Sequence, residues 1–443
     1  MAMSMTLCLL GSLFVLMQKY IRMIMNNPIE FIRVILLTLT FLSLISFNLS
    51  LFLLFLVLFI AFPLTLTEVP TNLSEKFPNK FRNEIMAAIT PSMKPFSMPI
   101  KYANGITQTI VSGASKFKKD YIPFNREMIA APDGGEFALD SAAHQEDLSV
   151  DAPIIYILHG LAGGCREPYI QRFVYFAMER KYRIFVLTNR GCAGTVMKTP
   201  QAYCSIFFDD ALQSLEMVHN KYPNAPIHLL GFSLGANTAL GLASRYSNTM
   251  EALNVSSAVG ISSSLFLISI MLSITPALDQ VFSSFELKLV QKNVEVWLDA
   301  IKKEKIFADV EKIMVSKTMK QFDDGFTSKA FALGQPSNYY YNVEQIHHFM
   351  RNTRIPCLTL NAEDDPVAIM TDQLFERMKN IASVSPFYIP LKTKTGGHLS
   401  WTFEEGKKGY YDDICLSFFD KVNDLVKCGE LKAMRDELVP QLN

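Results

Sequence analysis

The chain has 443 residues, and its 42 basic residues are matched by 42 acidic ones, so the formal net charge is zero. This balance gives no support to nucleic-acid binding, because phosphate backbones are bound by basic patches and the sequence has no basic stripe with interleaved aromatics. The seven cysteines are scattered without a Cys-x-x-Cys pair, so we predict neither a metal site nor a disulfide framework. The length allows one large domain of about 300 residues with appendages.

The N-terminal part predicts a membrane anchor. Val34 to Phe62 contains no charged residue, and about 20 apolar residues suffice to cross a bilayer, so we predict a transmembrane helix over 34–62. Basic residues precede it at Lys19, Arg22 and Arg33. The positive-inside bias then places residues 1–33 in the cytosol, which predicts a single-pass protein of the endoplasmic reticulum or another endomembrane. A second apolar run, Thr6 to Met17, is short for a span; if it also inserts, the rest of the chain returns to the cytosol.

Residues 63–100 read as a linker with repeated prolines and mixed charge. Within it, Lys80 to Ile89 has the pattern of a short amphipathic helix, which is suited to lying on the membrane surface.

From residue 101 the sequence alternates strand and helix patterns. A hairpin is predicted at Arg126–Ala131 and Glu136–Ser141, because a Pro-Asp-Gly-Gly turn separates two strand patterns. Later strands are predicted at Ile154–Leu158, Arg183–Asn189, Ile227–Leu230, Val255–Ser262, Cys357–Asn361 and Phe387–Lys392, with helices at Pro168–Arg180, Phe207–Lys221, Ala236–Tyr246 and Tyr410–Val426. The alternation predicts a mostly parallel sheet with helices on both faces, formed by residues 101–262 and 355–430 and followed by a tail, 431–443.

Residues 263–354 interrupt this alternation. Helical patterns dominate there, at Leu287–Lys303 and Val310–Lys320, and the segment is too long for a connecting loop, so we predict a helical cap inserted over the active site. Ser263 to Ile274 is strongly apolar. An apolar cap helix facing lipid or substrate is favoured, and a second membrane span is the alternative.

The sequence Gly231-Phe232-Ser233-Leu234-Gly235 lies between a strand pattern and a helix pattern. In this setting a G-x-S-x-G sequence predicts a nucleophile elbow, a sharp turn that presents the serine at the carboxyl edge of the sheet. The turn brings neighbouring segments close together, so residues without a Cβ are favoured on both sides. Ser233 is therefore the candidate nucleophile.

A serine nucleophile needs a base, and the base needs a carboxylate that orients it. When strands and helices follow this order, the acid comes after the penultimate strand and the histidine after the last one. His398 is the histidine in that position. Asp364 and Asp365 compete for the role of acid, and we favour Asp365 because Pro366 follows it directly.

The oxyanion of a tetrahedral intermediate needs preorganised N–H donors. One is expected from the residue after the nucleophile, Leu234. The second is expected from the loop after the Ile154–Leu158 strand, at Leu161. His159 precedes the elbow in the chain, so we expect it to shape this loop rather than to act as the base.

Together these residues resemble the membrane-anchored AB-hydrolase-4 group of α/β-hydrolase domain proteins. The matching blocks span about residues 100–430 and comprise Asn104-Gly105 with Gln108-Thr109-Ile110, His159-Gly160-Leu161 with Gly163-Gly164, Asn189-Arg190-Gly191-Cys192, Gly231 to Asn237, Phe322-Asp323-Asp324 with Phe326-Thr327, Tyr339-Tyr340, Asp364-Asp365-Pro366 and Gly396-Gly397-His398. One departure is Ile106, where the group usually has histidine. The resemblance implies an α/β-hydrolase fold with an N-terminal anchor and a serine hydrolase of lipid esters, acting as a monoacylglycerol lipase, a phospholipase or a carboxylesterase.

The leading hypothesis is therefore a membrane-bound enzyme that hydrolyses lipid acyl esters through Ser233, Asp365 and His398, without a cofactor. An acyltransferase that uses the same residues to acylate an alcohol or a lysolipid is the first alternative. A non-enzymatic membrane receptor built on this fold is the second. The lipid head group, the acyl chain length and the oligomeric state are left open.

Overall fold

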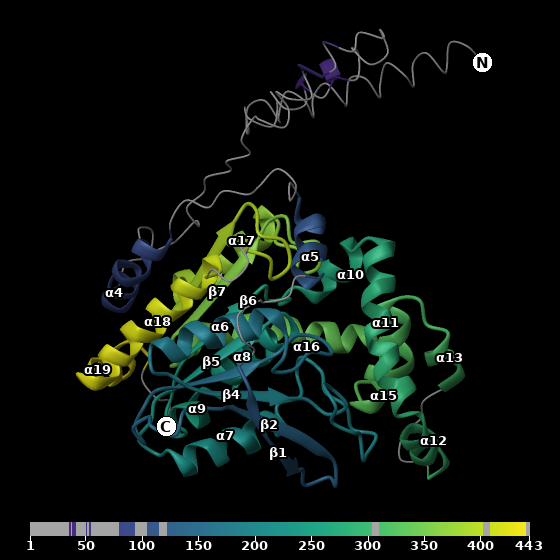
Figure 1. Ribbon diagram of the computed structural model, residues 1–443, viewed down its shortest axis with the longest axis horizontal. Coiled ribbons are helices and arrows are strands. Elements are labelled where there is room, and N and C mark those ends of the chain that lie inside the picture. The colour runs from purple at the N-terminus through teal and green to yellow at the C-terminus, as the bar shows by residue number, and fades with distance from the viewer. Residues whose placement is uncertain are drawn as a thin grey trace. The chain divides into compact units, whose positions relative to one another are not determined.

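A computed structural model of the chain describes residues 79–93, 104–114, 122–303, 310–401 and 408–439, together with isolated helical residues between 35 and 54 (Figure 1). The chain falls into two units, Met1–Thr67 with Ser97–Ala103, and Glu68–Phe96 with Asn104–Asn443. The predicted span Val34–Phe62, apart from those isolated residues, and the run Thr6–Met17 lie outside the described residues. Within the described residues, no helix is long and apolar enough to cross a membrane.

The second unit is organised around an eight-stranded sheet with the order β1-β2-β4-β3-β5-β6-β7-β8. Its strands are β1 (Phe124–Ala130), β2 (Glu136–Ala142), β3 (Ile154–Leu158), β4 (Arg183–Thr188), β5 (Ile227–Phe232), β6 (Val255–Ile261), β7 (Cys357–Ala362) and β8 (Tyr388–Thr393). β2 pairs antiparallel with both β1 and β4, and all other pairs are parallel. The predicted mostly parallel sheet and its opening hairpin are confirmed.

Helices cover both faces of the sheet. One face packs against α4 (Lys80–Ile89), α6 (Pro168–Glu179), α18 (Tyr410–Lys427) and α19 (Glu430–Leu438). The other packs against α7 (Asp209–Lys221), α8 (Leu234–Arg245) and α17 (Asp372–Val384). Alternate residues of β5 supply both cores, Leu230 to the first and Leu229 to the second. The sheet is thus buried on both faces, which explains why its central strand β3 is a continuous apolar run.

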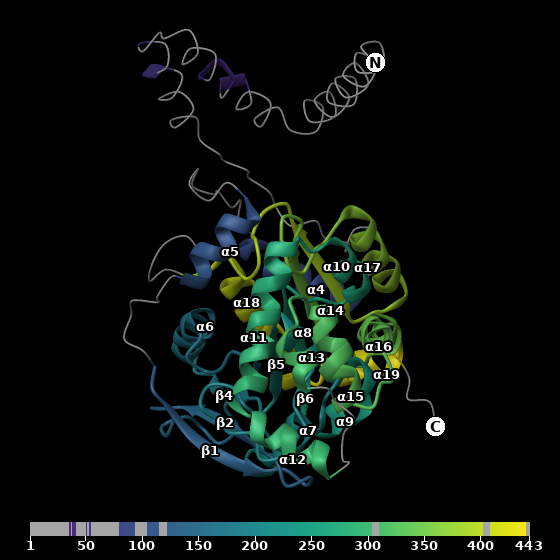
Figure 2. The same cartoon turned by 90° about the vertical axis from the view of Figure 1, so that its right-hand side faces the viewer.

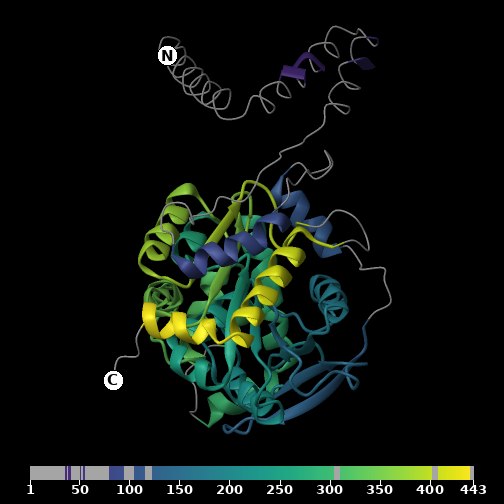
Figure 3. The ribbon, with the colours of Figure 1, turned by 90° about the vertical axis from the view of Figure 1, so that its left-hand side faces the viewer.

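The helix α4 has the predicted bounds but a different environment. Its apolar residues Phe81, Ile85 and Ile89 are fully buried in the first core, and Figure 3 shows α4 lying beside α18 from the far end of the chain. The expectation that this helix lies on the membrane surface is wrong, because the apolar face needed for that contact is covered by protein.

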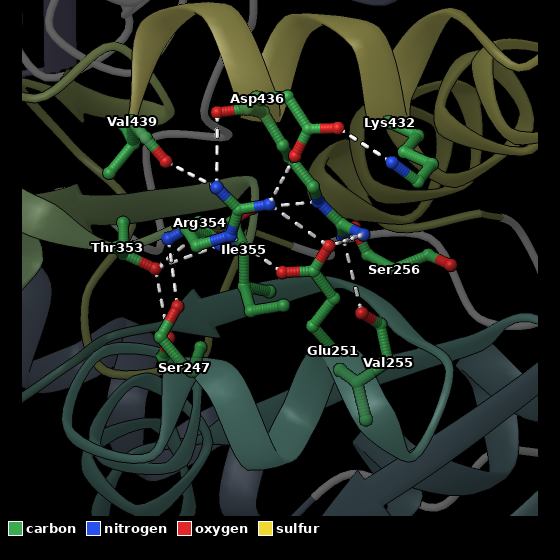
Figure 4. Close-up of polar contacts among 12 residues, drawn as sticks. Ser247, Glu251, Val255, Ser256, Thr353, Arg354, Ile355, Lys432, Asp436 and Val439 are labelled. Carbon is green, nitrogen blue, oxygen red and sulfur yellow. Dashed lines mark hydrogen bonds and ion pairs between the residues drawn. The ribbon is translucent and has the colours of Figure 1, made fainter. Parts of the chain in front are cut away.

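The predicted C-terminal tail, 431–443, is largely the helix α19. Figure 4 shows how it is held to the strand ends beneath it. The guanidinium of Arg354 bonds Glu251 (Nε to Oε2, 2.6 Å) and Asp436 (Nη2 to Oδ1, 2.9 Å), and Arg435 Nε donates to the Arg354 carbonyl (2.8 Å). Because Arg354 is buried, these bonds fix the last helix as part of the fold.

The segment between β6 and β7 is helical, as predicted for a cap. It contains α10 (Leu267–Ser273), α11 (Pro276–Lys292), α12 (Val294–Lys302), α13 (Val310–Met314), α14 (Met319–Phe322), a π-helical turn (Asp323–Thr327), α15 (Ser328–Ala330) and α16 (Pro336–Phe349). The alternative of a second membrane span at Ser263–Ile274 is wrong, since α10 is only 7 residues long. The single helix expected over Leu287–Lys303 is divided at Asn293, whose side chain bonds the Leu289 carbonyl and the Met197 N–H.

Candidate active site

The elbow after β5 has the geometry expected of a nucleophile turn. Ser233 adopts φ 54° and ψ −117°, a strained conformation for a residue with a Cβ. A Cβ on Gly231 would lie 2.2 Å from the Gly235 carbonyl oxygen, and a Cβ on Gly235 would lie 2.2 Å from that of Leu158. Both positions therefore require glycine, and the predicted reason for them is confirmed.

The structure brings Ser233, His398 and Asp365 together in one hydrogen-bonded line. His398 Nε2 lies 2.8 Å from Ser233 Oγ, and His398 Nδ1 lies 2.9 Å from Asp365 Oδ2. Asp365 is 2% exposed, and its Oδ1 also accepts hydrogen bonds from the N–H groups of Val367 and Ala368 at 2.8 Å each. The carboxylate is thus held rigidly behind the imidazole.

The neighbouring carboxylate, Asp364, has a different set of contacts. Its Oδ1 accepts the Gly397 N–H at 2.9 Å, and its Oδ2 accepts the Thr395 hydroxyl at 2.8 Å. Burial raises the pKa of this group. Asp364 therefore ties the loop after β7 to the loop that carries His398, whereas Asp365 contacts the imidazole itself.

The helix α5 (Gly105–Ala114) supplies contacts to the histidine loop that sequence reasoning did not assign. Thr109 Oγ1 accepts the backbone N–H of His398 at 2.9 Å, and Gln108 Nε2 donates to Thr395 Oγ1 at 2.8 Å and to Asp364 Oδ2 at 3.3 Å. A Cβ on Gly105 would lie 1.7 Å from the Asp364 carbonyl oxygen, so the helix approaches this loop closely. In the sequence, residues Asn104 to Ile110 pointed to this segment only as one block of the family resemblance, and that block assigned no role to Gln108 or Thr109.

The two N–H groups predicted for an oxyanion hole belong to Leu161 and Leu234. In the described part of the chain neither donates a hydrogen bond. The groups around Leu161 are engaged, since Gly160 N–H donates to Tyr169 Oη and Ala162 N–H donates to Tyr203 Oη, at 3.1 and 2.8 Å. These bonds fix the loop on both sides of Leu161.

His159 supports this loop, as expected, and does not contact Ser233. Its Nδ1 donates to the Gly160 carbonyl at 2.6 Å, and its Nε2 accepts the Asn189 N–H at 3.2 Å. Complete burial lowers the pKa of His159 to about 4, so the ring is neutral at physiological pH.

The cap approaches the site through α11. The ring of Phe282 stands edge-on to His398, with centroids 6.5 Å apart. Deeper in the cap, Tyr340 Oη donates to the buried carboxylate of Asp323 at 2.8 Å, and burial raises the pKa of Asp323 to about 6. The pKa of Glu286 on α11 is also raised by burial and by the Asp323 charge.

This arrangement suits nucleophilic chemistry at a carbonyl carbon. It combines a serine at a strained turn, a histidine within hydrogen-bonding distance, a carboxylate behind the histidine and two N–H groups on neighbouring loops. Among the residues that the structure describes, no group of three or more His, Cys, Asp or Glu side chains is arranged to hold a metal ion.

Comparison with known proteins agrees with this architecture. Residues 153–374 match the family described as the alpha/beta hydrolase fold. The matched region begins just before β3 and contains the elbow and both candidate acids, and it ends before His398.

Several of the similar curated proteins are enzymes of ester metabolism by name. The chain is 27% identical to a monoacylglycerol lipase of Saccharomyces cerevisiae, over 72% of each chain, and 27% identical to phospholipase ABHD3 of Bos taurus, over 68% of this chain and 72% of the relative. It is 22% identical to the medium-chain fatty acid ethyl ester synthase/esterase 2 of Saccharomyces cerevisiae, over 80% of this chain and 90% of the relative.

Proposed function

Because the chain belongs to the alpha/beta hydrolase family, we propose that it is a membrane-bound serine hydrolase that cleaves acyl ester bonds of lipids through Ser233, His398 and Asp365. The family and its lipase and phospholipase relatives make it an ester hydrolase of the lipase and esterase class. The observation that carries the proposed mechanism is the hydrogen-bonded line from Ser233 Oγ through His398 to Asp365.

The proposed reaction proceeds in two halves. His398 Nε2 accepts the Ser233 proton while Oγ attacks the ester carbonyl carbon, and Asp365 stabilises the imidazolium that forms. The N–H groups of Leu161 and Leu234 bind the oxyanion, and His398 then protonates the departing alkoxide, which leaves an acyl-enzyme. In the second half His398 removes a proton from water as the water oxygen attacks the acyl carbonyl carbon. His398 then returns this proton to Ser233 Oγ as the bond between Oγ and the acyl carbon breaks, which releases the fatty acid and restores Ser233.

Membrane attachment is the second part of the proposal. It is supported by the uncharged run Val34 to Phe62 and by the lipid substrates named in the relatives. With residues 1–33 cytosolic, the enzyme domain faces the lumen of an endomembrane, and the Asn72-Leu73-Ser74 sequon becomes available to glycosylation. A glycosidase-sensitive mass shift that disappears in Asn72→Gln is expected, and an unshifted wild-type chain would count against this orientation.

Labelling with a fluorophosphonate probe tests the mechanism. The wild-type chain should react covalently, and Ser233→Ala should not. Equal labelling of the two proteins would disprove the assignment of Ser233. A panel of monoacylglycerols, phosphatidylcholines and short-chain esters, analysed by mass spectrometry of the released acid, then defines the substrate.

Acyl transfer is the second candidate, and the similarity to the ethyl ester synthase/esterase is the observation that favours it. In this reaction an alcohol replaces water in the second half, and His398 removes its proton instead. Product analysis with ethanol or glycerol present separates the two, since transfer yields a new ester at the expense of free acid.

A further inference from the structure

The helix α5 buries its polar side and exposes its apolar side, which is the reverse of the usual arrangement. Its buried face is formed by Gly105 and Gln108, which is 1% exposed, and lies on the histidine loop. Its apolar side chains point outward, and Ile106, Ile110 and Val111 are 44%, 62% and 37% exposed. An amphipathic helix of a water-soluble unit normally buries its apolar stripe, so this outward stripe calls for an apolar partner.

Two cap helices repeat the pattern. In α10, Ile268 and Leu272 are exposed, the latter by 83%, and in α11, Val281 and Phe285 are exposed. Each pair is spaced by four residues and therefore lies on one side of its helix. Single exposed apolar residues are common on protein surfaces and need no explanation. Apolar stripes on three separate helices are not single residues, so they do call for one.

The three helices lie at the same end of the unit, and two of them contact the candidate site. Figures 1 and 2 both place α5, α10 and the beginning of α11 together at that end. α5 contacts the site through the bond from His398 N–H to Thr109, and α11 contacts it through Phe282. Two of the three helices thus contact His398, through residues other than those of their apolar stripes.

The charge pattern distinguishes a bilayer from a protein partner. Residues 102–115, which include α5, and residues 252–278, which include α10, contain no charged residue. Lysines flank the first of these stretches at Lys101, Lys116, Lys118 and Lys119. An apolar stripe bordered by lysines is typical of helices that lie in the interface of a membrane with anionic lipids.

We propose that the exposed apolar stripes of α5, α10 and α11 form a docking surface for a lipid bilayer. This inference rests on the proposed function, because docking would bring Ser233 close to an ester that resides in the membrane. The apolar stripe of α5 lies on the opposite side of the helix from the residues that contact the histidine loop. The helix can therefore contact the bilayer and the histidine loop at the same time.

Tryptophan fluorescence in lipid vesicles tests the docking surface directly. The two native tryptophans, Trp297 and Trp401, are each 1% exposed, so an added tryptophan at the surface is readable against them. The full chain carrying Ile110→Trp is reconstituted into vesicles of phosphatidylcholine and phosphatidylserine, with and without bromine on the phosphatidylcholine acyl chains. Bromine should quench the added emission.

The matched control is Val150→Trp, since Val150 is 67% exposed and precedes the amino end of β3, at the sheet edge opposite the site. Its emission should not respond to bromine. Equal responses of the two variants would overturn the proposal. Emission at position 110 that is protected from aqueous acrylamide but insensitive to bromine would also overturn it, because a protein surface or a second copy would then cover α5.

Activity gives a second readout. In the triple variant Ile106→Ser, Ile110→Ser and Val111→Ser, we expect hydrolysis of an ester embedded in vesicles to fall about tenfold, equivalent to roughly 1.4 kcal/mol of lost interfacial contact. Hydrolysis of a water-soluble butyrate ester should be unchanged, and an unchanged rate on the embedded ester would contradict docking. If the wild type hydrolyses neither ester, the proposed function fails, while the bromine experiment still decides the docking surface.

Discussion

Replacing Asp365 by asparagine tests the candidate triad most sharply, because the surrounding bonds dictate how the new amide is oriented. Asp365 Oδ1 accepts two backbone N–H groups, from Val367 and Ala368, so this position must remain an acceptor. The amide nitrogen of the introduced asparagine would then occupy the Oδ2 position, 2.9 Å from His398 Nδ1. The retained oxygen lies farther from Nδ1, at 3.1 Å. The amide N–H would therefore donate to Nδ1 and leave the imidazole proton on Nε2, the nitrogen that must be free to accept the serine proton.

The expected loss in kcat is about four orders of magnitude, or about 5 kcal/mol of transition-state stabilisation, as in serine proteases whose triad aspartate is replaced in this way. The assay is steady-state hydrolysis of a soluble butyrate ester by the full chain in detergent. Circular dichroism and the melting temperature should stay near wild type, since the asparagine keeps the volume and the acceptor at Oδ1.

The matched comparison is Asp364→Asn. This change weakens the charge-assisted bonds to Gly397 N–H and to the Thr395 hydroxyl, each by about 1 kcal/mol, but leaves the His398 tautomer intact. We expect kcat to fall about tenfold. A larger loss in Asp364→Asn than in Asp365→Asn would refute the assignment of the acid.

Three further changes test the surroundings of the site. Thr109→Val removes the acceptor of the His398 N–H, so kcat should fall about tenfold at unchanged KM, and Thr109→Ser should restore it; equal kcat values would exclude a positioning role for this residue. Gly235→Ala places a Cβ 2.2 Å from the Leu158 carbonyl and should lower the free energy of unfolding by about 3 kcal/mol in urea titrations. Asp323 holds its proton more tightly in the folded state, since burial raises its pKa from 3.8 to about 6. Its contribution to stability is therefore fully present below pH 3.8 and is lost as the pH rises to about 6, so the melting temperature of the wild type should fall relative to that of Asp323→Asn between about pH 4 and pH 6.

The strands and the candidate site residues could both be predicted from the sequence, because the site residues follow shortly after buried strands. Parallel strands buried on both faces are rich in apolar residues, and Ser233 and Asp365 lie just after the strands β5 and β7. The predicted strand Ile154–Leu158 matches β3 in full. The sequence also favoured Asp365 over Asp364, and the contact between Asp365 and His398 agrees with that choice.

The packing partners of the helices could not be predicted from the sequence, because periodicity shows that one side of a helix is apolar without showing which segment covers it. The helix Lys80–Ile89 was predicted correctly, yet its partner is α18, more than three hundred residues away along the chain. The break at Asn293 depends on a side-chain bond to Met197, on a loop outside the cap. Such contacts between distant segments have no local signature.

The position of Ile106 on α5 explains why isoleucine can replace the expected histidine there. Ile106 lies on the exposed side of the helix, whereas Gln108 is buried against the histidine loop. Isoleucine at this position, where the resemblance noted in the sequence implies histidine, therefore leaves the bonds around His398 unaffected and lengthens the outward apolar stripe. A polar residue in this place would weaken docking to a bilayer without altering the chemistry of Ser233, so the two properties of α5 can vary independently.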